Sequence, residues 1–221
     1  MSALVLGATG LCGSFFVKFA EKAAKFTSVN TITRRELDFE SKANQIVEKD
    51  STKWSELIPD DTKYLFSGLA TTRAAAGGLD NQYKIDYDLN IELAKAAKEK
   101  GCSTLVLVSS AGANEHSWIA YLKMKGEIER DMIKLGFDHT IILRPGAILG
   151  ERTSHHKGFG NDFGVFVGRM FYRSKCQFLV KYPVYAEEVS KVGVHLALEN
   201  SDQKVQIIES SEILEIAKNL E

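Results

Sequence analysis

Two side chains that could exchange a proton stand four residues apart in the stretch Tyr121-Leu-Lys-Met-Lys125. On a helix, residues i and i+4 share a face, so the phenol and the ammonium would lie side by side. A free phenol titrates near ~10, and a nearby ammonium lowers that pKa toward the range useful at neutral pH. The alternative is that both residues belong to the polar surface of an amphipathic helix, because tyrosine and lysine meet at this spacing often by chance.

A pair of serines, Ser109 and Ser110, ends the continuous apolar run Thr104–Val108, one predicted element before the tyrosine. Such a run is typical of a central strand in a parallel sheet, covered on both faces. Ligands bind at the carboxyl ends of these strands, so Ser110 is expected to hold a substrate carbonyl, with Ser109 as the second choice. Ser110, Tyr121 and Lys125 are therefore the predicted catalytic residues.

The first thirteen residues predict a cofactor site. An apolar run begins at Ala3, the glycines Gly7, Gly10 and Gly13 follow it, and helical periodicity begins at Ser14. Strand, glycine turn and helix in this order are typical of a dinucleotide-binding turn. The first glycine permits the turn, the second lets a pyrophosphate approach the backbone, and the third lets the helix pack on the sheet. The helix N-terminus would attract the phosphates. The alternative is an ordinary tight turn.

Two arginines, Arg34 and Arg35, follow the predicted second strand Val29–Thr33. In a dinucleotide-binding fold the end of this strand meets the adenosine ribose. An acidic residue there would bind the 2′-hydroxyl of NAD, whereas arginine suits the 2′-phosphate of NADP. The pair therefore favours NADPH as cofactor. A solvated basic pair, partly neutralised by Glu36, is the alternative.

The elements that must position these residues alternate along the chain. After the first strand, the expected strands are Val29–Thr33, Gln45–Lys49, Lys63–Gly68, Thr104–Val108, Phe137–Leu143 and Val205–Ile208. The expected helices are Leu11–Lys25, Gln82–Lys100, Ser117–Leu135, Ala186–Glu199 and Ser210–Asn219. This alternation predicts an α/β fold, a Rossmann-type doubly wound parallel sheet in a single domain over residues 1–221. Residues 151–183 break the rhythm and are expected to be a short insertion on the substrate side.

Two further segments are expected near the site. Residues 69–73 would form a loop at the end of the fourth strand, and the small residues 74–78 after it would be mobile. The helix from Gln82 carries Asp86 and Asn90. Asn90 is expected either to complete a proton relay or to be a surface amide.

Composition excludes several classes of function. The 221 residues carry a net charge of −1, which argues against a nucleic-acid binder that works through bulk charge. Three widely spaced cysteines indicate free thiols in a reducing compartment. A strand that starts at Ala3 leaves no room for a cleaved signal, and no apolar run approaches the ~18 residues of a membrane span.

One apolar face is a candidate for contact with a membrane surface. Its members recur at helical spacing in the expected insertion: Phe159, Phe163, Phe166, Val167, Met170 and Phe171. The basic residues Arg169, Arg173 and Lys175 could meet anionic headgroups. The alternatives are closure of the active site and a dimer contact.

Six motifs together resemble a known family. L-V-L-G-A-T-G-L-C-G, R-R-E-L, L-A-T-T-R-A-A-A-G-G, L-V-S-S-A-G-A, Y-L-K-M-K-G-E-I-E and I-I-L-R-P-G occur in this order from Ala3 to about Arg152. The set is similar to atypical short-chain dehydrogenases/reductases. More narrowly, it resembles small fungal proteins found peripherally on the mitochondrial outer membrane, and the animal Tat-interacting oxidoreductase-like tumour suppressor, which binds NADPH.

The resemblance implies roles for individual residues. The implied NADPH contacts are Gly7, Ala8, Thr9, Gly10, Leu11, Gly13, Arg34, Arg35, Leu69, Ala70, Tyr121 and Lys125. It also implies Tyr121 and Lys125 as an active-site pair, and a peripheral place on the mitochondrial outer membrane.

Two functions follow as expectations. The first is an NADPH-dependent oxidoreductase that passes a hydride to a small carbonyl-type substrate while Tyr121 donates the proton. The second is an NADPH-bound sensor or scaffold that acts through a protein partner, or as a homodimer, with little or no catalysis. The intact set Ser110, Tyr121 and Lys125 favours the first function. The short insertion favours the second, because few residues remain to shape a substrate pocket.

Overall fold

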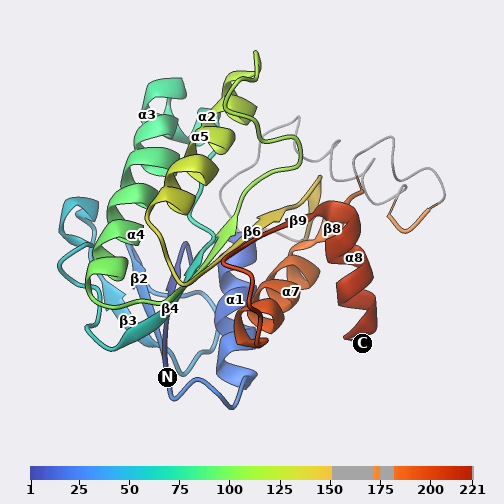
Figure 1. The fold of residues 1–221 in the computed structure, drawn as a ribbon. Helices are drawn as coiled ribbons and strands as arrows, with labels where there is room; N and C mark the ends of the chain where they lie inside the picture. Colours follow the sequence, from blue (N-terminus) through green and yellow to red (C-terminus); the bar gives the residue numbers. More distant parts are fainter. Residues whose placement is uncertain (151–171, 175–181, 221) are drawn as a thin grey trace.

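Seven parallel strands form the central sheet, in the order β3-β2-β1-β4-β5-β6-β9 (Figure 1). The strands are β1 (Ser2–Leu6), β2 (Ser28–Thr33), β3 (Asn44–Val47), β4 (Thr62–Ser67), β5 (Thr104–Val108), β6 (His139–Arg144) and β9 (Val205–Glu209). The structure, a computed structural model, describes residues 1–150, 172–174 and 182–220. The strand order turns back between β1 and β4, where a doubly wound sheet binds its ligand. The predicted Rossmann-type fold is confirmed.

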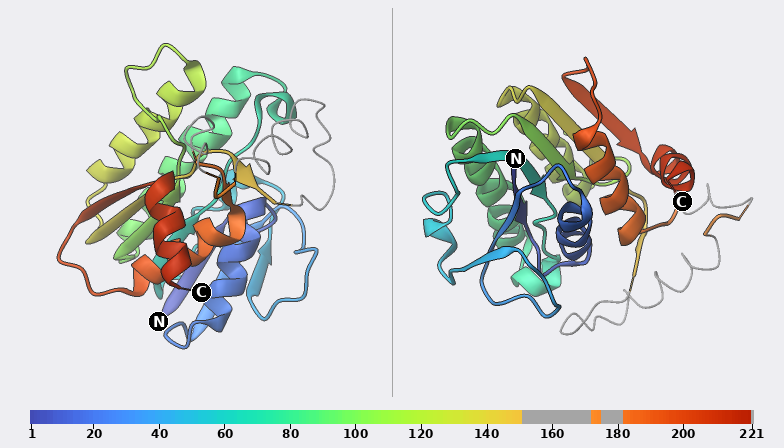
Figure 2. Two further views of the ribbon diagram at one scale, coloured as in Figure 1. Left: turned by 90° about the vertical axis from the view of Figure 1, so that its right-hand side faces the viewer. Right: turned by 90° about the horizontal axis from the view of Figure 1, so that it is seen from below.

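Helices cover both faces of this sheet (Figures 1 and 2). The helical segments are α1 (Leu11–Lys22), η1 (Ser51–Lys53), α2 (Arg73–Ala76), α3 (Leu79–Tyr83), η2 (Lys84–Leu89), α4 (Asn90–Glu99), α5 (Ala120–Lys134), α7 (Ala186–Leu198) and α8 (Ser210–Asn219). One face carries α3, η2, α4 and α5, and the other carries α1 and α7 with α8 beside them. A short parallel pair, β7 (Ile148–Leu149) and β8 (Val184–Tyr185), lies next to the main sheet.

Strand β1 shows how the two layers are built. Its side chains alternate, so Ala3 and Val5 join the core under α1 and α7, while Leu4 and Leu6 join the core under α4 and α5. All four side chains are fully buried. A strand that is apolar at every position therefore reflects burial on both faces, as its sequence predicted.

Three expectations about local structure need correction. The tyrosine helix does not begin after Ser117: α5 starts at Ala120, and the Ser117 hydroxyl accepts a hydrogen bond from the amide of Ile119. The segment expected to be mobile contains the short helix α2, which Thr72 caps and a left-handed Gly77 (φ 76°) ends. The helix expected from Gln82 is one run of α3, η2 and α4, in which η2 is a π-turn.

The expected insertion over 151–183 lies almost entirely outside the described residues. The same holds for the apolar face proposed as a membrane contact, whose six members fall between Phe159 and Phe171.

Candidate active site

The glycine turn after β1 is shaped by two close approaches. Gly7 adopts φ +73°, and a Cβ there would lie 2.6 Å from the carbonyl oxygen of Gly68. A Cβ on Gly13 would lie 2.0 Å from the carbonyl oxygen of Gly7. Any larger residue at either position would force β1, β4 and α1 apart. The roles expected for these two glycines, turning the chain and close packing of the helix, match this geometry.

Gly10 leaves the N-terminus of helix α1 accessible to a ligand. It is exposed, it occupies the N-cap position of α1, and no side chain caps the helix there. A Cβ on Gly10 would meet only the carbonyl oxygen of Gly7, at 3.0 Å. Uncapped amides at a helix N-terminus attract anions, and the missing Cβ gives a pyrophosphate access to the backbone. The turn therefore fits a dinucleotide.

The other residues expected to touch the cofactor lie at the same edge of the sheet. Arg34 and Arg35 are exposed directly after β2, and the Arg35 guanidinium lies 4.0 Å from the Asp38 carboxylate. Leu69 and Ala70 follow β4. The carboxyl ends of β1, β2 and β4 thus bring together the segments that the sequence analysis assigned to the nucleotide.

Helix α5 presents the tyrosine and the lysine as the spacing predicted. The Lys125 ammonium lies 5.9 Å from the centre of the Tyr121 ring. Tyr121 is 39% exposed, whereas Lys125 is 3% exposed. The phenol therefore stands where a ligand can reach it, and the ammonium reaches it from inside the protein.

A buried polar stripe on the neighbouring helix faces Lys125. Gln82, Asp86 and Asn90 follow one another at i, i+4 and i+8, and all three are buried. Asp86 places Oδ2 3.8 Å from the Lys125 ammonium, and its Oδ1 accepts a hydrogen bond from the amide of Thr71 (2.7 Å). Asp86 and Asn90 were expected on this helix from the sequence, but their burial with Gln82 and the contact of Asp86 with Lys125 were not.

Asn90 is not a surface amide. It accepts a hydrogen bond from the Ser67 hydroxyl (2.5 Å) and donates to the carbonyl oxygens of Leu69 and Asp86, both at 2.9 Å. Its side chain therefore fixes the start of the loop after β4 to the helix. The expected role in a proton relay stays a prediction.

The electrostatics of Asp86 are unusual for an aspartate. Burial raises the pKa of its carboxyl above the usual range, and Lys125 opposes that effect. Its Oδ2 atom is buried without a hydrogen-bond partner among the described residues. Asp86 and Lys125 are therefore both shielded from water, and at 3.8 Å their ion pair is longer than a direct hydrogen bond.

The two serines after β5 have different environments. Ser109 is buried, and its hydroxyl donates to Oε1 of Glu129. Ser110 is half-buried, and no hydrogen bond joins it to Tyr121 or Lys125 within the described part of the chain. Since the Ser109 hydroxyl is already engaged, Ser110 is the serine that remains for a ligand.

Glu129 belongs to a second charged cluster that the sequence analysis did not foresee. It is 4% exposed and receives two hydrogen bonds from Arg144, at 3.0 and 2.6 Å. Arg144 also binds Glu209 at 2.8 Å. Hydrogen bonds to Glu129 and Glu209 raise the pKa of the Arg144 guanidinium above its usual value, so it stays charged. The cluster joins α5 to the carboxyl ends of β5, β6 and β9.

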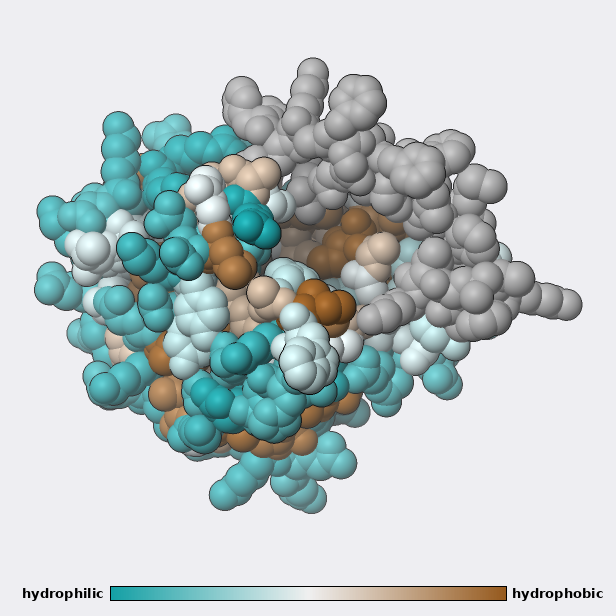
Figure 3. Space-filling model, turned by 90° about the horizontal axis from the view of Figure 1, so that it is seen from above, coloured by the Kyte–Doolittle hydropathy of each residue, from teal (hydrophilic) through white to brown (hydrophobic). Residues whose placement is uncertain are grey.

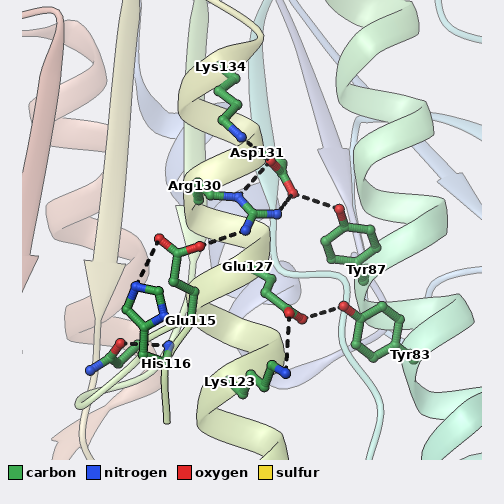
Figure 4. A network of polar contacts seen from close by, with 10 residues as sticks. Tyr83, Tyr87, Glu115, His116, Lys123, Glu127, Arg130, Asp131 and Lys134 are labelled. Atoms are coloured by element: carbon green, nitrogen blue, oxygen red, sulfur yellow. Dashed lines mark hydrogen bonds and ion pairs between the residues drawn. The ribbon is translucent and has the colours of Figure 1, made fainter.

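A third, more exposed network fixes α5 to the helix of Tyr83 and Tyr87 (Figure 4). The Tyr83 hydroxyl donates to Glu127, and the Tyr87 hydroxyl donates to Asp131 at 2.7 Å. Arg130 also binds Asp131, which holds the pKa of that carboxyl well below its usual range. The network fixes α5 to the helix that lies beside it on the same face of the sheet.

Seen from above, where the strands end, the described surface is hollowed (Figure 3). Apolar residues of the described chain lie inside the hollow. A concave, partly apolar surface at the carboxyl edge of a parallel sheet is where ligands bind in this kind of fold.

Solved structures place the fold in a class. The chain is similar to MoeE5 in complex with UDP-glucose and NAD, with a TM-score of 0.70, 15% identity, and coverage of 100% of this chain and 82% of that one. It is also similar to the UDP-glucose 4-epimerase of Thermus thermophilus in complex with NAD, with a TM-score of 0.68, 14% identity, and coverage of 99% and 83%. The chain therefore has the Rossmann-type fold of these solved structures.

Sequence comparison identifies the family. The HIM1 family model matches residues 60–173. The protein named FMP52, mitochondrial, of Saccharomyces cerevisiae is 58% identical over 227 residues, covering 100% of this chain and 98% of the relative. The chain belongs to the HIM1 family, in the group of proteins named FMP52.

Proposed function

We propose that the protein binds NADPH and reduces a small carbonyl-type substrate. The observation that carries this proposal is the meeting, at one sheet edge, of an open glycine turn and the pair Tyr121 and Lys125. The solved structures of the same fold were obtained with NAD, which supports a nicotinamide cofactor. The exposed arginines after β2 favour the phosphorylated form.

The roles of the chain's own residues follow from their positions. The cofactor supplies a hydride when bound. The turn from Gly7 to Gly13 would hold its pyrophosphate, and Arg34 and Arg35 would hold the 2′-phosphate. Ser110 would hold the substrate oxygen, and Tyr121 would donate a proton to it. Lys125 would favour the phenolate that remains and bind the nicotinamide ribose.

Titration calorimetry with NADPH and NADH tests the cofactor. NADPH is expected to bind more tightly, and Arg34→Asp is expected to weaken NADPH while sparing NADH, because the lost charge faces only the 2′-phosphate. Lys204→Asp is the matched control, since this exposed lysine lies at the opposite edge, just before β9. Equal affinities of the unaltered protein for both nucleotides would contradict the proposal.

Turnover tests the tyrosine. Tyr121→Phe is expected to keep NADPH binding nearly intact and to abolish NADPH oxidation in a screen of aldehydes, ketones and quinones. Lys125→Ala is expected to damage both, whereas Lys123→Ala, an exposed lysine on the same helix, is expected to change neither. A Tyr121→Phe variant with the normal rate would show that another group donates the proton.

The second candidate is an NADPH-bound sensor that acts through a protein partner. The observation that favours it is the pair of apolar residues before α5: Trp118 is 103% exposed and Ile119 is 60% exposed. Large apolar side chains so exposed are candidates for contact with a partner. Tight NADPH binding without turnover in the same screen would favour this candidate.

The proposed location is the surface of the mitochondrial outer membrane. Its support is the word "mitochondrial" in the names of the relatives and the resemblance to peripheral fungal proteins. Among the residues that the structure describes, no helix is long and apolar enough to cross a membrane.

Co-sedimentation with anionic vesicles tests the membrane contact. Phe163→Asp with Phe166→Asp is expected to release the protein from the vesicles while NADPH binding survives. Unchanged co-sedimentation of this double variant would place the contact elsewhere. The resemblance to the animal Tat-interacting protein stays a prediction from the sequence.

A further inference from the structure

The carboxylate of Asp86 connects two parts of the proposed nucleotide site. Its Oδ1 atom holds the amide of Thr71, which directly follows Leu69 and Ala70. Its Oδ2 atom faces the Lys125 ammonium at 3.8 Å. The residue is 0% exposed, and Oδ2 has no hydrogen-bond partner among the described residues. A buried carboxylate is thus shared between the cofactor loop and the proposed ribose-binding lysine.

The groups that face this carboxylate come from three elements. Gln82, on its own helix, is neutral, and so is Thr71 in the loop after β4. Helix α5 contributes Lys125, with the Tyr121 ring 5.9 Å beyond it. The cation among these groups is Lys125, so the negative charge of Asp86 depends on where that ammonium lies.

We propose that Asp86 is a positioning residue whose Oδ2 atom takes up one proton from solvent when a nucleotide draws the Lys125 ammonium toward its ribose hydroxyls. Lys125 keeps its own protons in this step, and no bond other than the new O–H bond of Asp86 is formed or broken. The inference rests on the proposed binding of NADPH. It adds to that function a linkage between nucleotide affinity and pH.

The direction of the linkage follows from the geometry. Burial already favours the neutral carboxyl of Asp86, and the nearby ammonium opposes this. Moving the ammonium away removes that opposition, so the pKa of Asp86 is higher in the complex than in the free protein. Proton uptake is confined to the pH window between the two pKa values. Inside the window, nucleotide affinity falls by up to about tenfold for each unit of rising pH.

Titration calorimetry in two buffers with different ionisation enthalpies counts the protons. At each of several pH values, the difference in apparent enthalpy gives the number of protons taken up with each NADPH bound, and the window is the pH range where this number is highest. The expected number approaches one in the wild type and is close to zero in Asp86→Asn. The 2′-phosphate of NADPH also titrates, near ~6, but it contributes to both proteins alike, so the difference between them is the measured quantity. Asp88→Asn, an exposed carboxylate in the same turn, is the matched control and is expected to behave like the wild type.

Every outcome decides the proposal. NADPH binding with equal proton numbers in the wild type and in Asp86→Asn at every pH measured would overturn the linkage alone. Absence of NADPH binding to the wild type would overturn the proposed function and the linkage together. If Asp86→Asn does not fold, infrared difference spectra of the wild type decide instead. A protonated-carboxyl band that appears on NADPH addition supports the proposal, and its absence across the pH range overturns it.

Discussion

Helix α5 buries two charged side chains one turn apart, and the protein holds them in different ways. Glu129 receives a hydrogen bond from Ser109 and two from Arg144, which itself binds Glu209. Among the described residues, Lys125 forms one ion pair, with Asp86 at 3.8 Å. Both are nearly inaccessible, at 4% and 3% exposure. Burial is therefore the same for the two charges, and the number of hydrogen bonds distinguishes them.

The difference separates a structural cluster from a functional one. Removing ions from water costs several kcal/mol, which only well-placed hydrogen bonds offset. Around Glu129 these bonds are complete, and they tie strand ends together. Around Lys125 they are incomplete, so the ammonium retains donors for a ligand. Incompletely paired buried charges with a shifted pKa are typical of functional sites.

Breaking the complete cluster is expected to have the largest effect. Arg144→Met leaves Glu129 buried without its partner, which costs about 3 kcal/mol of the free energy of unfolding. Urea unfolding followed by circular dichroism measures this loss. The double variant Arg144→Met with Glu129→Leu is the control, and it is expected to recover most of the stability because no unpaired charge remains. A loss below about 1 kcal/mol in the single variant would mean that the cluster is not structural.

Removing the carboxylate of the incomplete cluster is expected to have a smaller effect. Asp86→Asn keeps an oxygen for the Thr71 amide and is expected to cost about 1 kcal/mol at acid pH. Because burial raises the pKa of Asp86, the stability tied to its neutral form is present below the ordinary aspartate pKa and declines as pH rises through the folded value. Asparagine does not ionise, so the deficit of the variant shrinks toward neutral pH.

Urea unfolding at several pH values measures that trend. Asp88→Asn is the control and is expected to show no such trend, because Asp88 is exposed. If Asp86→Asn lost as much free energy of unfolding at neutral pH as Arg144→Met, both clusters would be structural, and the contrast between them would be wrong.

The exposed network of Figure 4 is expected to contribute least. Tyr87→Phe removes one hydrogen bond to Asp131, at a cost of about 0.5–1 kcal/mol, and Arg130 and Lys134 still hold that carboxylate. Thermal and urea unfolding of this variant measure the loss in the free energy of unfolding, for comparison with the losses expected in the two buried clusters. A cost above about 2 kcal/mol would show that the contributions of the three networks to stability do not follow their burial.

Local pattern predicted most of the fold. Strand β5 has the bounds expected from sequence, because a fully apolar run is a strong local signal. Helix α8 also has the expected bounds, but its N-cap is Glu209, whose amide donates to Glu212, and not Ser210 or Ser211 as expected from sequence. The expected N-cap of α5, Ser117, lies two residues before the observed one, Ile119, since the Ser117 hydroxyl binds the amide of Ile119 in a turn before the helix instead of capping it. Side chains favoured at helix caps are also favoured in such turns, so sequence alone does not separate the two.

The candidate site could be predicted only in part. Tyr121 and Lys125 share a helix, so their spacing carries the information. Asp86 and Arg144 reach α5 from other elements, and their partners are set by how helices and strands pack. The sequence contains one local sign of this packing: Glu129 follows Lys125 by four residues, so the two charged side chains share a face of α5.

The wide turn η2 has a consequence for changes in chain length. A π-turn contains one residue more than an α-helix needs over the same span. Deleting a residue there would restore a regular helix and rotate everything before it by about 100° relative to Asn90. Gln82 would leave the loop it supports, where it now binds the carbonyl oxygen of Thr71. Insertions and deletions are therefore expected to be excluded from this helix over evolution, although much of its outer face is polar and would accept substitutions.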